Sequence, residues 1–177
     1  MPVSSFAFVE ETFNTFRCQD FAVKVAESQW EKHAYFKLRR DVFSLEQKIL
    51  PKNETDAEDF KAIPIVAIAT TCGVHDSVVG AVRIYTTGDN VWFGGRLCVD
   101  KQYRGIPFIG KALINEAVSR AKTLGCEQFL ANVQTQNERY FRRLYWKSLE
   151  KIKIESRLHV RMEAILEHYP FMKRYGS

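Results

Sequence analysis

VDKQYRGIPFIGKALI, residues 99–114, joins an apolar strand-like run to a helical pattern through a charged loop. Such a loop exposes backbone N–H groups that have no partner inside the helix, and the helix dipole adds positive potential there. Gly105 and Gly110 let the main chain approach a phosphate closely, and Arg104 and Lys111 supply charge. The loop therefore predicts an anion-binding site, although many glycine-containing strand–helix turns bind nothing.

Length and composition predict one domain over residues 1–177. The chain is 46% apolar and 27% charged, and no repeat, low-complexity tract or Pro/Gly-rich linker divides it. No apolar run approaches the roughly 20 residues of a membrane helix, so we expect no membrane partner. The opening residues MPVSSFAFVEETF lack the basic start and long apolar stretch of a signal peptide. We therefore expect a cytoplasmic protein.

The four cysteines, Cys18, Cys72, Cys98 and Cys126, lie far apart in apolar or strand-like sequence. They form no C-x-x-C pair, which a metal or redox site often requires. We therefore expect buried, reduced thiols that act as small hydrophobic side chains, and no metal site.

The positive charge of the chain is concentrated near its C-terminal end. Residues 137–161 hold eight Lys and Arg against three Glu, a difference of five that equals the whole formal charge of +5. This excess predicts contact with a phosphate-bearing small molecule, an acidic protein or a nucleic acid, unless it is a solvated helix face. No recognition-helix or RNA-binding pattern is present, so we do not expect a nucleic-acid partner.

Residue periodicity predicts the secondary structure. The predicted strands cover 20–27, 63–71, 77–85, 91–99, 127–133, 149–154 and 158–166, and the predicted helices cover 28–49, 108–124 and 137–147. The first helical region begins with the capping-box pair Ser28 and Glu31 and is one long helix or two short ones. The order strand, helix, three strands, helix, strand, helix, two strands predicts a mixed α/β (α+β) domain with a mostly antiparallel sheet.

Three connecting features have local signals. The acidic segment PKNETDAEDFKA, residues 51–62, begins with proline and predicts an exposed loop. A short turn at 73–76 predicts an antiparallel hairpin. Gly94 and Gly95 within a strand predict a bulge or a close approach by another group.

Two segments resemble the acetyl-CoA-binding half of the GNAT superfamily of N-acetyltransferases. Residues 104–110 resemble its pyrophosphate loop, Arg/Gln-x-x-Gly-x-Gly/Ala, and residues 137–146, NERYFRRLYW, resemble its Asn-led helix. Residues 36–50, FKLRRDVFSLEQKIL, are similar to a first-helix segment that acyl-homoserine-lactone synthase relatives share. The resemblance covers residues 20–166. Within the superfamily, IPIVAIA, FLANVQTQN, FRRLYW and HVRMEAILEHYP look like a bacterial and cyanobacterial branch linked with nitrogen starvation and nitrilase gene clusters.

The resemblance implies a sheet of six or seven strands, splayed where acetyl-CoA binds, and direct attack of an amine on the thioester. A backbone N–H near residues 97–99 would polarise the carbonyl group. Helical phase makes Arg143 the arginine of its helix best placed to reach a phosphate. The residues expected to contact the coenzyme are Leu97, Cys98, Val99, Arg104, Gly105, Ile109, Gly110, Lys111, Ala112, Asn137, Phe141 and Arg143.

The chain departs from the family pattern at two places. Its loop is one residue longer, and Pro107 and Phe108 stand in place of the middle glycine, so the cradle loses one N–H donor. Weaker or differently posed coenzyme binding could follow. Phe141 stands where the family often has a tyrosine that protonates the leaving thiolate, and a phenyl ring cannot donate a proton.

The general base has two candidates. Many relatives use a glutamate on strand 91–99, but this chain has Gly94, Gly95 and Arg96 there. Glu46 could accept a proton directly or through water, and His159 is of a residue type suited to proton exchange near neutral pH. The ordinary alternatives are an exposed helix glutamate and a hydrogen-bonded strand histidine.

Three functions follow from these features. The leading hypothesis is transfer of an acetyl group from acetyl-CoA to a small-molecule amine by a monomer or homodimer. The second is transfer of a longer acyl group from acyl-CoA or from acyl carrier protein, whose acidic surface would suit the basic C-terminal region. The third is a non-catalytic acyl-CoA sensor, which the substitutions at Pro107 and Phe141 would explain.

Overall fold

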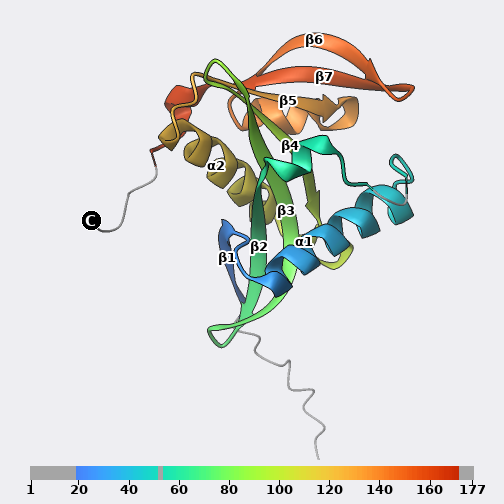
Figure 1. The fold of residues 1–177 in the computed structure, drawn as a ribbon, viewed down its shortest axis with the longest axis vertical. Coiled ribbons are helices and arrows are strands. Elements are labelled where there is room, and N and C mark those ends of the chain that lie inside the picture. The colour runs from blue at the N-terminus through green and yellow to red at the C-terminus, as the bar shows by residue number, and fades with distance from the viewer. Residues whose placement is uncertain (1–18, 52–53, 172–177) are drawn as a thin grey trace, which may run out of the picture.

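The computed structural model describes residues 19–51 and 54–171, which form one open seven-stranded sheet with helices on both faces (Figure 1). The strands are β1 (Gln19–Val25), β2 (Ile63–Thr71), β3 (Val74–Gly88), β4 (Val91–Val99), β5 (Gln128–Gln134), β6 (Trp146–Ile154) and β7 (Arg157–Ala164). The α-helices are α1 (Gln29–Arg40), α2 (Pro107–Thr123) and α3 (Glu138–Arg143). The predicted order of strands and α-helices is confirmed.

The sheet has the order β1-β2-β3-β4-β5-β7-β6, and only the β4–β5 pair is parallel. The mostly antiparallel sheet predicted above is therefore confirmed. Cys72 and Gly73 join β2 to β3, and Asp89 and Asn90 join β3 to β4, all four with positive φ. Two-residue turns of this conformation match the twist of antiparallel strands. The turn predicted at 73–76 is therefore shorter, because β3 already begins at Val74.

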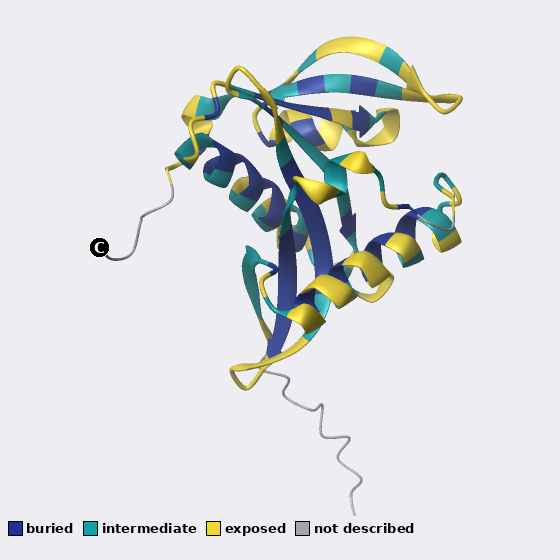
Figure 2. Ribbon diagram, in the orientation of Figure 1, coloured by how far each residue is buried: buried dark blue, intermediate teal, exposed yellow. Residues whose placement is uncertain are grey.

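The core lies on both faces of the sheet. Ile65, Ala67 and Ala69 of β2 pack in a cluster with α2, whereas Val66 and Ile68 between them pack in a cluster with α1. All five side chains are fully buried. Figure 2 shows the burial concentrated in the central strands and the sheet-facing sides of α1 and α2. Strand alternation thus assigns the two helices to opposite faces.

Helix α1 begins at the predicted capping box. The Ser28 hydroxyl accepts the N–H of Glu31, and the Glu31 carboxylate accepts the N–H of Ser28. Burial alone would raise the pKa of Glu31, but a hydrogen bond from Lys24 and the backbone N–H groups outweigh burial and lower it to about 2. The helix continues directly into a π-helical turn, Asp41–Glu46, so the region is one continuous helical run. Such turns are frequent at functional sites.

The acidic segment 51–62 is only partly the exposed loop that the sequence predicts. Its described part contains a short 3₁₀ helix, Ala57–Phe60, and the Glu54 side chain is buried. Carboxylates of this segment pair with three arginines from α1, β3 and β4. We call this set, Arg39, Arg83, Arg96, Glu54, Asp56 and Asp59, the arginine–carboxylate cluster. Ion pairing explains why so acidic a segment lies against the sheet.

Helix α3 is shorter than predicted, since it ends at Arg143 and β6 already begins at Trp146. The change of direction occurs at Tyr145, which has a φ of +64°, a left-handed value that glycine adopts more readily. The ring stacks on His168, with centroids 3.9 Å apart, and the Tyr145 carbonyl accepts the N–H of Ile165 at 2.9 Å. Contacts from the C-terminal part of the chain therefore accompany this unusual backbone position.

Tyr145→Gly is expected to be more stable to unfolding than Tyr145→Ala, by about 1 kcal/mol. Both variants lose the stacked ring, but only glycine relieves the left-handed strain. Urea denaturation of the two variants and the wild-type protein measures the difference. An alanine variant at least as stable as the glycine variant would contradict the strain at this position.

Three other predictions concern burial and the chain ends. Cys98 and Cys126 are free and buried as predicted, whereas Cys72 is exposed in the β2–β3 turn, where the prediction is wrong. Cys18 and the MPVSSFAFVEETF segment lie outside the described residues, as do 172–177 at the end of the predicted domain. Within the described parts of the chain, none of the helices is long and apolar enough to span a membrane.

Candidate active site

The sheet opens between β4 and β5. The two strands pair only between Val91–Gly94 and Gln128–Ala131. On β4, Arg96 and Leu97 lie opposite the single residue Val82, which is a β-bulge, and Arg96 has a φ of +56°. Bulges bend a strand away from its neighbour. A cleft of about 250 Å³ lies at this opening.

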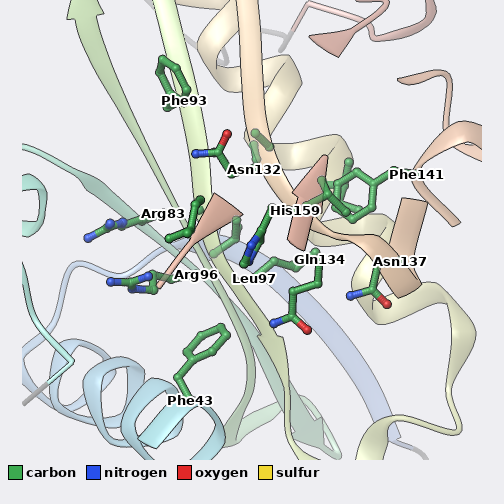
Figure 3. A pocket seen from close by; sticks show the side chains of 18 of the residues that line it. Phe43, Arg83, Phe93, Arg96, Leu97, Asn132, Gln134, Asn137, Phe141 and His159 are labelled. Carbon is green, nitrogen blue, oxygen red and sulfur yellow. The ribbon is translucent and has the colours of Figure 1, made fainter. Parts of the chain in front are cut away.

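The cleft has an apolar side and a polar side. The lining on the α2 and α3 side is apolar and consists of side chains from these helices and from the strand positions that face them: Leu97, Ile114, Ala117, Val118, Phe129, Phe141 and Trp146. The lining toward α1 is mixed: Phe43, Arg83, Arg96, Asn132, Gln134 and His159 (Figure 3). The cleft therefore joins the two faces of the sheet, so that two reactants could enter from opposite sides.

The glycine pair has different surroundings at its two positions. A Cβ at Gly94 would lie 3.0 Å from a ring carbon of Phe129, closer than ordinary packing allows. A Cβ at Gly95 would lie at 3.6 Å from Arg83 Nε, an ordinary contact. The close approach predicted from the sequence is thus found at Gly94, and the bulge falls just after the pair.

The predicted phosphate loop leads into α2 through Ile106, whose side chain makes no capping hydrogen bond. The N–H of Ile106 bonds to the Tyr103 carbonyl at 3.0 Å, and Pro107 has no N–H. The N–H groups of Phe108 and Ile109 lie in the first turn of α2 and have no partner within the helix. A Cβ at Gly105 would meet no heavy atom within 4 Å, so the main chain is open there. These features fit a diphosphate group.

Gly110 lies one turn into α2, next to α3. A Cβ at Gly110 would lie 3.1 Å from the Tyr140 hydroxyl oxygen, so glycine allows this close approach. Ile109 beside it is buried in the core, which leaves only its backbone able to face the loop, and Ala112 is half-buried. Lys111 is exposed. The loop and the first turns of α2 thus present main chain and the Lys111 side chain.

Arg104 and Glu46, predicted for different roles, are brought together. Arg104 forms a two-pronged ion pair with the Glu46 carboxylate, with Nη2 at 2.8 Å from Oε2, and its Nε donates to the Val99 carbonyl at 2.9 Å. The hydrogen bonds from Arg104 lower the pKa of Glu46. Glu46 does not line the cleft among the described residues. The pair therefore ties the end of β4 to the π-helical turn after α1.

The other predicted coenzyme contacts divide into two groups. Leu97, Asn137 and Phe141 line the cleft, and Phe141 packs edge-on against Trp146 at 5.1 Å between centroids. Cys98 faces the α1 side instead, where burial raises its pKa to about 12, so only its main chain could face the cleft. Arg143 is exposed and does not line the described cleft.

His159 lines the polar side of the cleft, opposite Gln134 in the β5–β7 register. Its Nδ1 lies 3.1 Å from the Arg157 carbonyl oxygen. Because a carbonyl oxygen can only accept, this hydrogen bond requires the proton on Nδ1, which leaves the lone pair of Nε2 available in the neutral ring. The imidazole is therefore held in a form that can take up a proton.

Sequence reasoning gave no role to Arg83, Arg96, Phe43, Asn132 or Gln134, which line the same side of the cleft. Arg83 carried a detectable signal, because an arginine inside the apolar strand VVGAVRIY must find a buried partner. The other four have no comparable local pattern. They come together only through the register of β4, β5 and the segment after α1.

Comparison with known proteins identifies the family. Residues 23–148 match the family model "Acetyltransferase (GNAT) family". Curated proteins include no sequence similar enough to match.

Solved structures show the same fold. A Lactobacillus plantarum protein assigned as an N-acetyltransferase is 21% identical, with a TM-score of 0.72 over 81% of this chain and 97% of that one. An N-acyl amino acid synthase from uncultured soil microbes is 9% identical, with a TM-score of 0.67 over 82% and 90%. An aminoglycoside 6'-N-acetyltransferase complexed with coenzyme A is 11% identical, with a TM-score of 0.66 over 88% and 99%. The chain belongs to the GNAT family of acetyltransferases.

Proposed function

We propose that the protein transfers the acetyl group of acetyl-CoA to the amine of a small molecule by direct attack. The observation that carries this proposal is the cleft at the β4–β5 opening, which has an open loop and helix start beside it and His159 on its polar side. The loop before α2 would hold the diphosphate, and the apolar side would hold the acyl-bearing arm. Coenzyme A in the complex of the aminoglycoside acetyltransferase, which shares this fold, supports the assignment.

In this mechanism His159 Nε2 removes a proton from the acceptor ammonium. The neutral amine attacks the thioester carbon, and an N–H of β4 beyond Gly94, where β4 no longer pairs with β5, stabilises the oxyanion. The new C–N bond forms and the C–S bond breaks. The amide nitrogen loses its extra proton to solvent, and the leaving thiolate takes up a proton from the imidazolium or from solvent. Because these protons come from the imidazolium and solvent, the scheme requires no acid from α3, and it is compatible with Phe141, which supplies no proton.

A longer acyl group is the second candidate. The apolar side of the cleft extends beneath α2 to Ala117 and Val118, deeper than an acetyl group requires. The N-acyl amino acid synthase with the same fold supports this candidate. Rates with acetyl-CoA and octanoyl-CoA would separate the two, and binding without turnover would favour a sensor. We also propose that the protein belongs to the nitrogen-starvation branch of the superfamily. We further propose that it is cytoplasmic and that it is a monomer or a homodimer.

Gly110→Glu is expected to weaken acetyl-CoA binding at least about tenfold, because it places a carboxylate beside the diphosphate site. Isothermal titration calorimetry measures the dissociation constant. Gly110→Gln is the matched control: it brings the same bulk against Tyr140 without charge, so it should weaken binding less than the glutamate variant. Gly105→Ala, whose Cβ meets open space, tests whether a ligand needs that space.

Two results would contradict the coenzyme site. Wild-type protein that binds no acetyl-CoA would overturn the proposed acetyltransferase. Equal binding by the wild-type protein and the glutamate variant would place the diphosphate away from this loop. Both comparisons require that the variants retain the wild-type melting temperature within a few degrees.

A further inference from the structure

Arg96 is the least compensated of the three arginines in the arginine–carboxylate cluster. Arg39 makes five hydrogen bonds, to Glu54, Asp59 and Tyr35. Within the described chain, Arg96 makes one, from Nη2 to Asp56 Oδ2 at 3.0 Å. Its Nε lies 3.5 Å from Glu54 Oε2 and is buried without a hydrogen-bond partner. Arg96 Nη1 makes no hydrogen bond within the described chain, and the side chain is 23% exposed, so this donor remains available for an anion.

The pKa shifts of the three arginines also single out Arg96. Carboxylates outweigh burial and raise the pKa values of Arg39 and Arg83, whereas burial and the neighbouring Arg83 lower the pKa of Arg96. Asp56 and Glu54 act against this shift, but they are shared with the other two arginines. Burial and Arg83 therefore disfavour the charged form of Arg96 more than the shared carboxylates favour it.

The position of Arg96 links this charge to the reaction. It lines the cleft at the β4 bulge, has a φ of +56°, and directly precedes Leu97, which lines the opening. Strained backbone of this kind is often found at ligand sites. Figure 3 shows Arg96 and Arg83 on the same side of the cleft. An anion held by Arg96 would therefore lie in the same cleft as the reacting thioester.

The neighbouring lining is apolar. Phe43, Ile49 and Leu50 come from the segment after α1, and Tyr85 and Phe93 stack on each other with centroids 5.9 Å apart. A ligand that fills this side needs an apolar body as well as a negative group. A polar sugar or a polyamine would leave these surfaces unfilled and would place positive charge against Arg96.

We propose that Arg96 binds the carboxylate of the acceptor and that the acceptor is an amino acid with an apolar side chain. The proposal rests on the proposed function and narrows its acceptor class. One carbon separates the amine from the carboxylate in an α-amino acid, which suits a cation and a reacting carbonyl on the same short stretch of β4. Arginine binds carboxylates with two parallel N–H donors, which gives direction as well as charge.

Phenylalanine and phenylalaninamide test the role of the carboxylate. They share side chain and amine, and the amide replaces the carboxylate by a neutral group. The measured quantity is kcat/KM from coenzyme A thiol release with acetyl-CoA. Wild-type protein is expected to prefer phenylalanine at least about tenfold. The amine of the amide is less basic, which favours its attack near neutral pH, so basicity cannot produce the expected preference. Leucine and leucinamide provide the aliphatic pair.

Arg96→Gln should raise KM for phenylalanine about tenfold or more and leave kcat/KM for phenylalaninamide within about twofold. Arg96→Lys retains the charge and should restore part of the preference. Arg157→Gln is the matched control, because Arg157 also lines the cleft, and it should keep the preference. A purely structural role for Arg96 would instead lower the rates for both acceptors together.

Shifts in melting temperature on ligand binding test the carboxylate site even if the protein acetylates neither acceptor. In the presence of coenzyme A, N-acetylphenylalanine should stabilise wild-type protein more than N-acetylphenylalaninamide does, and Arg96→Lys should show a smaller difference. If the protein acetylates neither acceptor but is stabilised more by the acid than by the amide, the proposed reaction is rejected and the carboxylate site is retained. Equal rates and equal thermal shifts for the acid and the amide would overturn the carboxylate site. Loss of preference in Arg157→Gln with retention in Arg96→Gln would overturn the assignment to Arg96.

Discussion

Arg39→Met is expected to lower the free energy of unfolding by about 3–5 kcal/mol, with a fall in Tm of roughly 6–20 °C. The Arg39 side chain is fully buried and binds Glu54 at 2.8 Å and Asp59 at 2.7 Å. Burial alone would raise the pKa of Asp59, but hydrogen bonds from Arg39 and Arg83 outweigh burial and hold it at about 2. Without Arg39, two buried carboxylates lose their shared partner. Thermal and urea unfolding measure the effect.

Lys37→Met is the matched control on the same helix. Lys37 pairs with Asp41 at 2.7 Å, but their side chains are 60% and 39% exposed. Solvent screening makes such a pair worth about 0–1 kcal/mol, so the control should unfold nearly like wild type. Similar losses in both variants would show that removal of a helix cation, and not an uncompensated buried charge, causes the effect.

The arginine–carboxylate cluster also shows where prediction from sequence ends. The capping box of Ser28 and Glu31, the alternation of β2 and the helical phase of α2 are local signals, and each produced the correct element. Burial of Glu54 depends on arginines that arrive from three elements far apart in the chain. A local acidic pattern predicts only solvent exposure, because it cannot contain those partners.

The candidate site residues also divide into those that local sequence predicts and those that only contacts between distant segments reveal. Sequence reasoning placed Asn137, Phe141, Leu97 and His159 at the site, and the structure places all four along one cleft. It also assigned Glu46 and Arg104 separate roles, although the two side chains pair with each other. Their contact spans two distant segments, so neither side chain signals it locally. Tyr145 is similar, because the run RRLYWK continues a helical pattern while contacts from His168 and Ile165 accompany a left-handed turn.

His159→Gln is expected to lower kcat/KM about 10²–10⁴-fold. Glutamine preserves a side chain of similar size that can donate a hydrogen bond, but it cannot take up the proton of the acceptor ammonium. Steady-state rates from pH 5 to 9 measure the loss. Acetyl-CoA binding should stay within a few-fold of wild type.

Glu46→Gln is the matched test of the other base. Glu46 is exposed and ion-paired with Arg104, and its lowered pKa makes it a weak acceptor of protons. This variant should therefore retain kcat/KM within a few-fold. If Glu46→Gln instead costs more than His159→Gln, the amine must lose its proton on the Arg104 side of the opening. The acceptor would then enter beside the π-helical turn, and the available Nε2 of His159 would have another use.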